Sequence, residues 1–381
     1  IVGNCVGVGG FGITYKAWDT SLNSMVAIKE FYPAGLVSRV PGEKEIVVFS
    51  GDKKEQFDIA IKRFLDEART MAKFTGHPNI VHVFDFFEEN STAYIVMEFL
   101  DGITVKKFLE SSPEGKLDID TATNIILSVL DALSEMHSKK IIHRDISPDN
   151  IQITSSNEIK IFDFGAAKLT KDDSEETRSI VVKTGYTPPE QYRAKSKQGA
   201  FTDLYSVGAV LYKLLTGTTP DESIDRTVDD KLKKPSKMGA DVDGTIDRVV
   251  MKSLALKHEL RFQNANQFKD ALLAKKNVDF PEVELKKRRR FRIIVTALLS
   301  LFTVAFITLF SMYITSEGDD PLVCNDGKIS VFLPVSYDPA VLDFVSTSAQ
   351  VYNAQTEGVI YYALAGNSRI TTETFTFCTK T

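Results

Sequence analysis

Residues 143–151 read HRDISPDNI, a stretch whose side chains could handle a proton and a metal ion. Asp145 and Asn150 lie five positions apart, behind a His-Arg pair and around a proline. This combination is typical of a loop that holds a metal ion and a hydroxyl group. Two positions after the aspartate stands Ser147, so this position supplies no cation that could neutralise a transferred anionic group.

A second candidate is the glycine-rich stretch GVGGFG at residues 7–12, with the spacing G-x-G-x-x-G. Glycines let the backbone approach phosphate groups closely and point its N–H groups at them. A dinucleotide-binding fold uses the same spacing, but it requires a helix directly after the glycines and an acidic residue about 20 positions later. Here a β-prone run, GITYKAW, follows instead, and the next run contains VAIK, which ends in Lys29. The pattern therefore disfavours the dinucleotide fold.

The third candidate is a pair of opposite charges, Lys29 and Glu67. A lysine in an apolar strand is costly without a partner, and the helical stretch RFLDEARTMA offers Glu67. Taken singly, each residue is better explained as a solvated surface charge. The order of the motifs reverses this: glycine loop, VAIK, helix glutamate, HRD-x-x-x-x-N and DFG. In that order the chain, over about residues 1–275, resembles a protein kinase, specifically the bacterial membrane-anchored Ser/Thr type.

The resemblance implies a site that uses ATP and Mg²⁺. The glycine loop would cover the ATP phosphates, and Lys29 would hold the α and β phosphates while paired with Glu67. Asp145 would accept the proton of the substrate hydroxyl, and Asn150 and Asp163 would bind Mg²⁺. Met97 would gate the adenine pocket, and the backbone from Glu98 to Leu100 would meet the base. The implied nucleotide-binding residues are Gly7, Val8, Gly9, Gly10, Gly12, Thr14, Ala27, Lys29, Met97, Glu98, Leu100 and Gln152.

Four departures from the family pattern bear on this site. Thr14 replaces the valine that caps adenine, a change that nearly preserves shape. Gln152 stands where an apolar residue forms the adenine floor, which predicts lower nucleotide affinity. Residues 32–55 enlarge the stretch between Lys29 and Glu67, and we expect a surface excursion there with EIVVFSG as an extra strand. The fourth departure is Ser147.

In Ser/Thr kinases the catalytic loop carries a lysine at the position of Ser147, and this lysine neutralises the moving γ-phosphate. A threonine three residues before the tyrosine of the Y-x-A-P-E stretch touches that lysine and the catalytic aspartate. Here the stretch is KTGYTPPE, and counting back from Tyr186 places Lys183 in the threonine's position. We hypothesise that the lysine has exchanged sides, since stabilising the transferred group requires a cation at a point in space, whatever its origin in the chain. The alternative is that Lys183 is solvated and the enzyme is weak.

Further residues are implied as scaffold or as control elements. Glu190 of PPE would pair with Arg261, and Asp203 would brace the catalytic loop from a helix start. Arg144 precedes Asp145, a pairing that in the family accompanies phosphorylation of the activation segment. The hydroxyl groups that could be modified there are those of Thr170, Ser174, Thr177 and Ser179.

Residues 293–314 form an uncharged run of 22 residues, IIVTALLSLFTVAFITLFSMYI. As a helix this run would span about 33 Å, close to the bilayer core of about 30 Å. Before it, residues 286–292 read KKRRRFR, which favours a positive-inside determinant over a nucleic-acid patch. We therefore expect a basic linker at 276–292, a transmembrane helix, a cytoplasmic domain at 1–275 and an extracytoplasmic segment at 315–381. A buried core helix is the alternative for the apolar run.

Composition fits this organisation. The chain has 381 residues, 43% of them hydrophobic and 25% charged, as in ordinary globular proteins, and its net charge of -5 argues against general nucleic-acid binding. Cys5 lies on the expected cytoplasmic side. Cys324 and Cys378 lie beyond the span, where an oxidising compartment would permit a disulfide. The chain starts without Met, and we expect that it begins inside a domain and is truncated at either end.

These observations lead to one main expectation and one rival. We expect an α+β bilobal kinase fold, with a β-rich N-lobe at about 1–100 and a helical C-lobe at about 101–275. The β-prone runs GITYKAW, MVAIKEF, EIVVFSG and AYIVMEF predict strands, and apolar spacing predicts a helix from about Lys54 to Lys73. Apolar residues at helical spacing also predict helices in DIDTATNIILSVLDALSEMH, LYSVGAVLYKLLTG and FQNANQFKDALLAK. The function expected is Ser/Thr protein phosphorylation with ATP and Mg²⁺ at the plasma membrane, including autophosphorylation, on a protein substrate that stays unidentified. An external ligand or partner could bind residues 315–381. A homodimer stays open, since Thr296 and Ser300 make only a weak small-residue pair. The rival is a pseudokinase receptor that acts as a binding scaffold, and Ser147 and Gln152 weakly favour it.

Overall fold

The structure is a computed structural model, and it describes residues 1–21, 23–163, 168–169, 183–193, 196–274 and 276–316. It divides into two units, Ile1–Arg290 and Phe291–Thr381. The first unit holds the glycine-rich stretch, Lys29, Glu67, the catalytic loop and Asp163.

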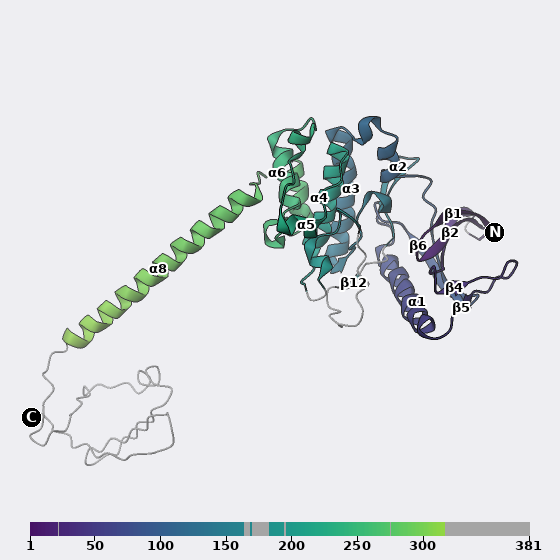
Figure 1. Cartoon of the computed structure of the whole chain (residues 1–381), viewed down its shortest axis with the longest axis horizontal. Coiled ribbons are helices and arrows are strands. Elements are labelled where there is room, and N and C mark those ends of the chain that lie inside the picture. Colours follow the sequence, from purple (N-terminus) through teal and green to yellow (C-terminus); the bar gives the residue numbers. More distant parts are fainter. Residues whose placement is uncertain (22, 164–167, 170–182, 194–195, 275, 317–381) are drawn as a thin grey trace, which may run out of the picture. The chain divides into compact units, whose positions relative to one another are not determined.

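An antiparallel five-stranded sheet with the order β1-β2-β3-β7-β6 forms the N-lobe (Figure 1). The prediction of strands in GITYKAW, MVAIKEF and AYIVMEF is confirmed by β2, β3 and β7, and helix α1 follows where the apolar spacing predicted it. Strands β1 and β6 were not predicted, because β1 is glycine-rich with all its residues exposed and β6 is largely exposed. The bounds are β1 Val2–Val8, β2 Gly12–Asp19, β3 Ser24–Phe31, β6 Val83–Glu89, β7 Thr92–Glu98 and α1 Asp52–Met71, with the 3₁₀ turn η1 Ala72–Phe74 after α1.

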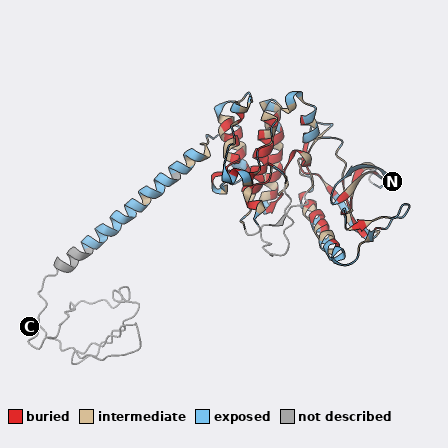
Figure 2. Cartoon of the chain, viewed as in Figure 1, coloured by how far each residue is buried: buried red, intermediate tan, exposed pale blue. Residues whose placement is uncertain are grey.

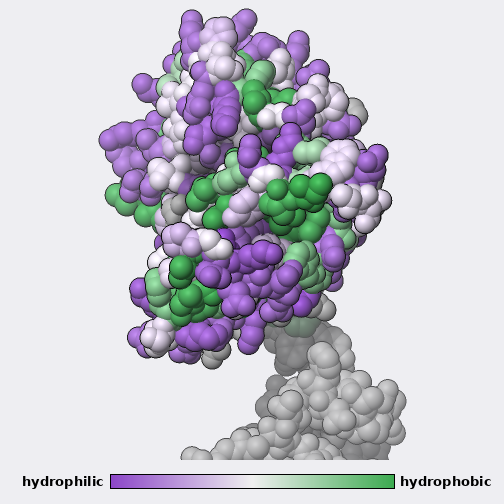
Figure 3. Space-filling view, turned by 90° about the vertical axis from the view of Figure 1, so that its right-hand side faces the viewer, coloured by the Kyte–Doolittle hydropathy of each residue, from purple (hydrophilic) through white to green (hydrophobic). Residues whose placement is uncertain are grey.

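The stretch between β3 and α1 is packed more closely than predicted. Its EIVVFSG segment does contain a strand, β5 (Val47–Val48), which pairs with β4 (Val37–Ser38). The expected surface excursion is wrong in part, because Val37 and Ile46 are only 6% and 4% exposed and belong to the lobe's core cluster. Seen from the N-lobe end, the surface shows apolar side chains in separate patches among polar ones (Figure 3).

The C-lobe is mainly helical, and helices α3 (Ile119–Ser138) and α4 (Ala200–Thr216) lie at its centre (Figures 1 and 2). Asp118 caps α3 by accepting a hydrogen bond from Thr121 N at 2.8 Å. Of the 17 residues of α4, 14 are buried, since the helix is packed on nearly every side. The remaining helices are α2 Val105–Glu110, α5 Ser223–Val228, α6 Gly244–Ser253 and α7 Ala265–Leu272, with 3₁₀ turns η2 Pro113–Gly115, η5 Pro235–Met238 and η6 His258–Leu260.

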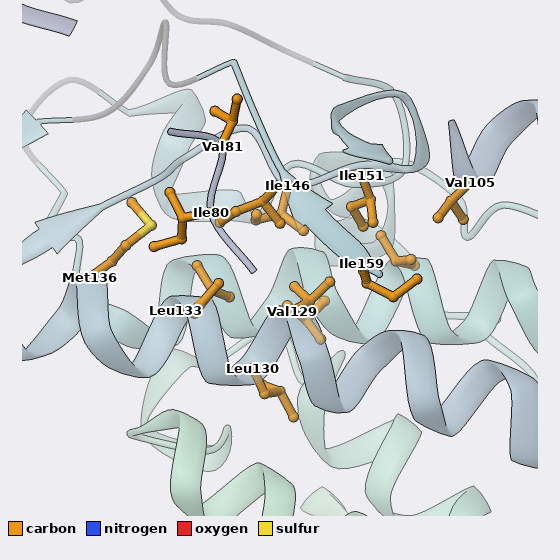
Figure 4. Close-up of a cluster of buried hydrophobic side chains, with 14 of the residues drawn as sticks. Ile80, Val81, Val105, Val129, Leu130, Leu133, Met136, Ile146, Ile151 and Ile159 are labelled. Atoms are coloured by element: carbon orange, nitrogen blue, oxygen red, sulfur yellow. The ribbon is translucent and has the colours of Figure 1, made fainter. Parts of the chain in front are cut away.

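The core of the C-lobe supports the catalytic loop directly. Val129 and Leu133 on α3 belong to the same buried cluster as Ile146 and Ile151, the apolar residues within and after that loop, and Met136 lies next to Ile80 (Figure 4). Each such buried aliphatic side chain stabilises the fold by about 1.5–3 kcal/mol. The loop's surrounding elements are β8 Gly102–Thr104, β9 Ile141–Ile142, η3 Pro148–Asn150, β10 Ile151–Thr154, β11 Ile159–Ile161, β12 Lys168–Leu169 and η4 Pro189–Tyr192.

Helix α8 (Pro281–Ser316) contains the apolar run and also most of the stretch predicted as a charged linker. The helix begins at Pro281, a residue favoured in a first helical turn, and continues through Glu, Leu, Lys and Arg, which are good helix formers. Within the described residues it is the one helix long and apolar enough to cross a membrane, and its apolar window is fully exposed (Figure 2).

Several predicted features lie outside the described residues. They are the hydroxyl residues Thr170, Ser174, Thr177 and Ser179, the cysteines Cys324 and Cys378, and nearly all of the segment 315–381.

Candidate active site between the two lobes

The glycine-rich stretch connects β1 to β2 at the edge of the N-lobe sheet. Gly9 N donates a hydrogen bond to Gly12 O at 2.8 Å, which closes the turn. Gly12 is required here because a Cβ at this position would lie 2.3 Å from Glu30 O in the neighbouring strand. In the register of the sheet, Thr14 lies between Gly7 and Lys29, so the turn and the lysine belong to adjoining strands.

Lys29 lies on β3 and contacts two carboxylates from different elements. Its Nζ is 3.4 Å from Glu67 Oε1 on α1 and 3.0 Å from Asp163 Oδ1. Burial alone would lower the pKa of Lys29, but the charges of Asp163 and Glu67 outweigh burial and raise this pKa above its usual value. Lys29 in turn holds the pKa of Asp163 below its usual range. The ammonium of Lys29 therefore contacts both carboxylates, and its contact with Glu67 agrees with the pairing predicted from the sequence.

The catalytic loop joins β9 to β10 and holds Asp145 and Asn150 together. Asn150 Nδ2 donates to the backbone oxygen of Asp145 and to its Oδ2, both at 2.8 Å. The amide oxygen of Asn150 takes no part in these two bonds, so it is the atom that could bind a cation. Lys29 Nζ donates to Oδ1 of the Asp163 carboxylate, which has a second oxygen. An amide oxygen and a carboxylate oxygen suit a hard cation such as Mg²⁺, so the two residues fit the metal that the family resemblance implies.

Lys183 and Ser147 lie together, as the spacing from Tyr186 predicted. Lys183 Nζ donates to Ser147 Oγ at 2.9 Å and is 3.1 Å from Asp145 Oδ2. Ser147 is fully buried, and the Asp145 side chain is 14% exposed. Burial raises the pKa of Asp145, and Lys183, His143 and Asn150 oppose this rise.

Thr187 holds the backbone of Lys183 in place, a role that was not predicted. Lys183 N donates to Thr187 Oγ1 at 2.9 Å, and Thr187 Oγ1 donates back to Lys183 O at 3.2 Å. Ser223 Oγ on α5 donates to Thr187 O at 2.7 Å, and Ser206 Oγ on α4 donates to Tyr186 O at 2.9 Å. The only signal in the sequence was the hydroxyl type of Thr187 within KTGYTPPE. Two C-lobe helices thus fix the turn that carries the lysine.

Asp203 braces the catalytic loop, as predicted. Its carboxylate is fully buried at the start of α4 and accepts hydrogen bonds from His143 N at 2.9 Å, Arg144 N at 2.7 Å and His137 Nε2 at 2.7 Å. Burial would raise the pKa of Asp203, but these donors and nearby charges keep this pKa below its usual value. Arg144 has a φ of 68°, a left-handed conformation that the two backbone bonds to Asp203 support.

The segment after β7 lies between the lobes at the predicted position of the adenine pocket. Met97 and Ala27 are paired across β7 and β3, and both are buried. Gln152 Nε2 donates to Leu100 O at 3.3 Å, so the unusual floor residue is tied to this segment. Glu98 Oε1 lies 2.9 Å from Nζ of Lys160 on β11, a link between the lobes that was not predicted.

The predicted pair of Glu190 and Arg261 is buried on the side of η4. Arg261 Nη1 and Nη2 reach the two carboxylate oxygens of Glu190 at 2.6 Å and 3.0 Å. Arg261 also donates to the backbone oxygens of Ala255, Leu256 and Phe201. The pair fixes the segment that follows Lys183 to the C-lobe.

The family model of the protein kinase domain matches residues 1–279. A relative from Clostridium acetobutylicum, named as a probable serine/threonine-protein kinase, is 32% identical over 279 residues, which are 71% of this chain and 39% of that protein. The serine/threonine-protein kinase PknB of Mycobacterium tuberculosis is 32% identical over 294 residues, 74% of this chain and 43% of that protein. The chain thus spans about two fifths of the length of these relatives.

Solved structures agree with the sequence relatives. A structure titled PpkA-294 apo form is 35% identical and superposes with a TM-score of 0.63, covering 71% of this chain and 95% of that one. The kinase domain of Mycobacterium tuberculosis PknI, at 23% identity and a TM-score of 0.54, covers 72% of this chain and 95% of that one and shows the same fold. Since the family model covers residues 1–279 of 381, the chain belongs to the protein kinase family.

Proposed function

We propose that this chain is a membrane-anchored Ser/Thr protein kinase that transfers the γ-phosphoryl group of ATP to protein hydroxyl groups. The observation that carries the proposal is the contact of Lys183 Nζ with both Asp145 and Ser147. Lys183 thereby supplies a cation beside Asp145, the proposed base, where the catalytic loop carries the neutral Ser147.

The proposed reaction forms a bond between the substrate hydroxyl oxygen and the γ-phosphorus and breaks the bond from that phosphorus to the β-phosphate oxygen, so that ADP leaves. The hydroxyl proton passes to the Asp145 carboxylate. Asn150 holds this carboxylate through Nδ2, which orients it toward the incoming hydroxyl. Lys29 would bind the α and β phosphates and keep them in line with the base.

Lys183 has three N–H donors on its ammonium group. One meets Ser147 Oγ and one meets Asp145 Oδ2, which leaves the third for an oxygen of the γ-phosphate. A cation fixed in this way stabilises the charge that develops on the transferred group. Bound Mg²⁺, held by Asn150 and Asp163, would supply further neutralisation of the phosphate charges.

The membrane anchor rests on α8. The described apolar residues of this helix are exposed, from Ile293 at 57% to Leu309 at 66%. An exposed apolar stripe of this length needs a lipid environment, and the six cationic residues of 286–292 favour a cytoplasmic position for the kinase domain. The segment 315–381 would then lie on the opposite side, where it could bind an external ligand or partner.

Phosphate transfer tests the proposed function. The full chain, purified in detergent, is incubated with radiolabelled ATP, Mg²⁺ and a general protein substrate, beside the Asp145→Asn variant. We expect label on serine and threonine of the substrate and of the chain itself, and loss of nearly all label in Asp145→Asn. Label on tyrosine would contradict the specificity, and equal label with both proteins would contradict the role of Asp145. Nucleotide binding without any label would favour the scaffold function.

A further inference from the structure

Residues 32–51 form an insert between β3 and α1, and its first residues bind the glycine-rich turn. Tyr32 N donates to Phe11 O, and Ala34 N donates to Gly10 O, both at 3.1 Å. These bonds continue the pairing of β3 with β2 beyond the end of the regular strands. The tip of the turn is therefore attached to the insert.

An ion pair between partly exposed Arg39 and buried Glu30 fastens the middle of the insert to β3. Arg39 Nη1 donates to Glu30 Oε2 at 3.1 Å, and Arg39 Nη2 pairs with Glu30 Oε1. Glu30 is 1% exposed and also accepts from Tyr15 Oη at 3.0 Å and Tyr94 Oη at 2.9 Å. Since neighbouring residues of a strand point to opposite faces, Glu30 carries the pair on the face opposite that of Lys29.

The end of the insert packs beside α1. Phe49 N donates to Leu36 O at 3.0 Å, which closes the insert on itself. Ile46 N donates to Asn90 O at 3.1 Å, in the turn between β6 and β7. Val37 and Ile46 are buried in the same core cluster as Phe57 on α1. The insert thus contacts the glycine-rich turn, the strand that carries Lys29 and the helix that carries Glu67.

We propose that this insert is a brace that holds the glycine-rich turn in its phosphate-binding position, and that Arg39 is the positioning residue on which the brace depends. Glycine residues lose more conformational freedom than others when they become ordered. If the turn is already ordered in the free protein, it loses less conformational entropy when ATP binds. The brace would therefore increase the affinity for ATP. The inference rests on the proposed function, because it assigns the ATP phosphates to this turn.

Arg39→Met tests the brace in the full chain in detergent. The variant loses hydrogen bonds to a charged carboxylate, and each such bond contributes about 1.5–3 kcal/mol. Since about 1.4 kcal/mol corresponds to a tenfold change in affinity, we expect the KM for ATP to rise about tenfold. We expect kcat to stay nearly unchanged, because Asp145 and Lys183 do not contact the insert. Backbone hydrogen exchange at residues 9–12 should become faster, and Arg39→Lys should restore part of both properties.

Arg226→Met is the control, because Arg226 is an arginine of the C-lobe, on α5, that is more deeply buried than Arg39 and pairs with Asp230 and Tyr205. It should lower stability while the KM for ATP and the exchange at residues 9–12 stay at wild-type values. The brace is refuted if Arg39→Met behaves in the same way as this control.

If Arg39→Met does not fold, the double variant Glu30→Gln with Arg39→Met takes its place, since it removes both charges of the pair at once. The exchange measurement needs no phosphate transfer. If the chain transfers no phosphate, the proposed function fails, and unchanged exchange at residues 9–12 would still decide against the brace on its own.

Discussion

At the residue scale, the charge of Asp145 depends on Lys183. Burial raises the pKa of Asp145, and the ammonium group of Lys183, 3.1 Å away, opposes the rise. Asp145 must be deprotonated to accept a proton, so the proposed reaction loses rate as pH falls through this pKa. Lys183 would therefore have two effects, stabilising the transferred phosphate and keeping the base ionised at lower pH.

Replacing Lys183 by Gln should shift the acidic limb of the kcat/KM profile to higher pH. The shift is toward higher pH because Lys183 lowers the pKa of Asp145, and removing Lys183 lets that pKa rise further. The measurement is kcat/KM against pH for both proteins, with Lys269→Gln as a control for a lysine far from the site, where it pairs with Asp131. A lower rate with an unmoved acidic limb would show that Lys183 does not influence the base.

Residue positions that depend on local motifs could be predicted from the sequence. The pair of Lys183 and Ser147 follows from counting back from Tyr186, and their contact at 2.9 Å confirms the predicted proximity. The bonds between Arg39 and Glu30 could not be predicted, because Arg39 lies in the stretch that departs from the family pattern. A buried carboxylate within the apolar strand MVAIKEF was the one signal available.

At the element scale, the ion pair of Glu190 and Arg261 fastens η4 to the C-lobe. Both residues are buried, at 7% and 2% exposed. Removing one partner of such a pair leaves an uncompensated buried charge, so Arg261→Met should lower the free energy of unfolding by about 3–5 kcal/mol. The pair of Lys269 and Asp131, whose side chains are 33% and 46% exposed, is the comparison, and Lys269→Met should cost about 1 kcal/mol or less.

Urea unfolding of both variants gives these free energies. Equal losses in Arg261→Met and Lys269→Met would contradict the structural role of the buried pair.

Elements with a strong apolar period were predicted well, and elements whose partners lie far away in the chain were not. Helices α1, α3, α4 and α7 and strands β2, β3 and β7 overlap their predicted segments. Strand β6 contains Asp85, Glu88 and Glu89 and is held by pairing with β7, which a local pattern does not show. The first turns of α8 were predicted as a linker because of their many charged residues, although Glu, Leu, Lys and Arg all favour a helix.

At the scale of the whole molecule, α8 should keep the chain in the membrane. Its basic residues precede its apolar residues, so the kinase domain should lie on the cytoplasmic side. We expect the chain to stay with membranes after extraction with alkaline carbonate. Protease should digest the kinase domain in inverted vesicles and spare it in right-side-out vesicles. Release by carbonate, or the reverse pattern of protection, would contradict the anchor or its orientation.

The exchange of Lys183 and Ser147 is tested most directly by moving the lysine back to the catalytic loop. Loss of one stabilising group near a transition-state charge typically costs about 10²–10³ in kcat, so Lys183→Thr should lose activity on this scale. We predict that Ser147→Lys combined with Lys183→Thr recovers most of the kcat for phosphate transfer. A double variant no more active than Lys183→Thr, although folded and able to bind ATP, would contradict the account.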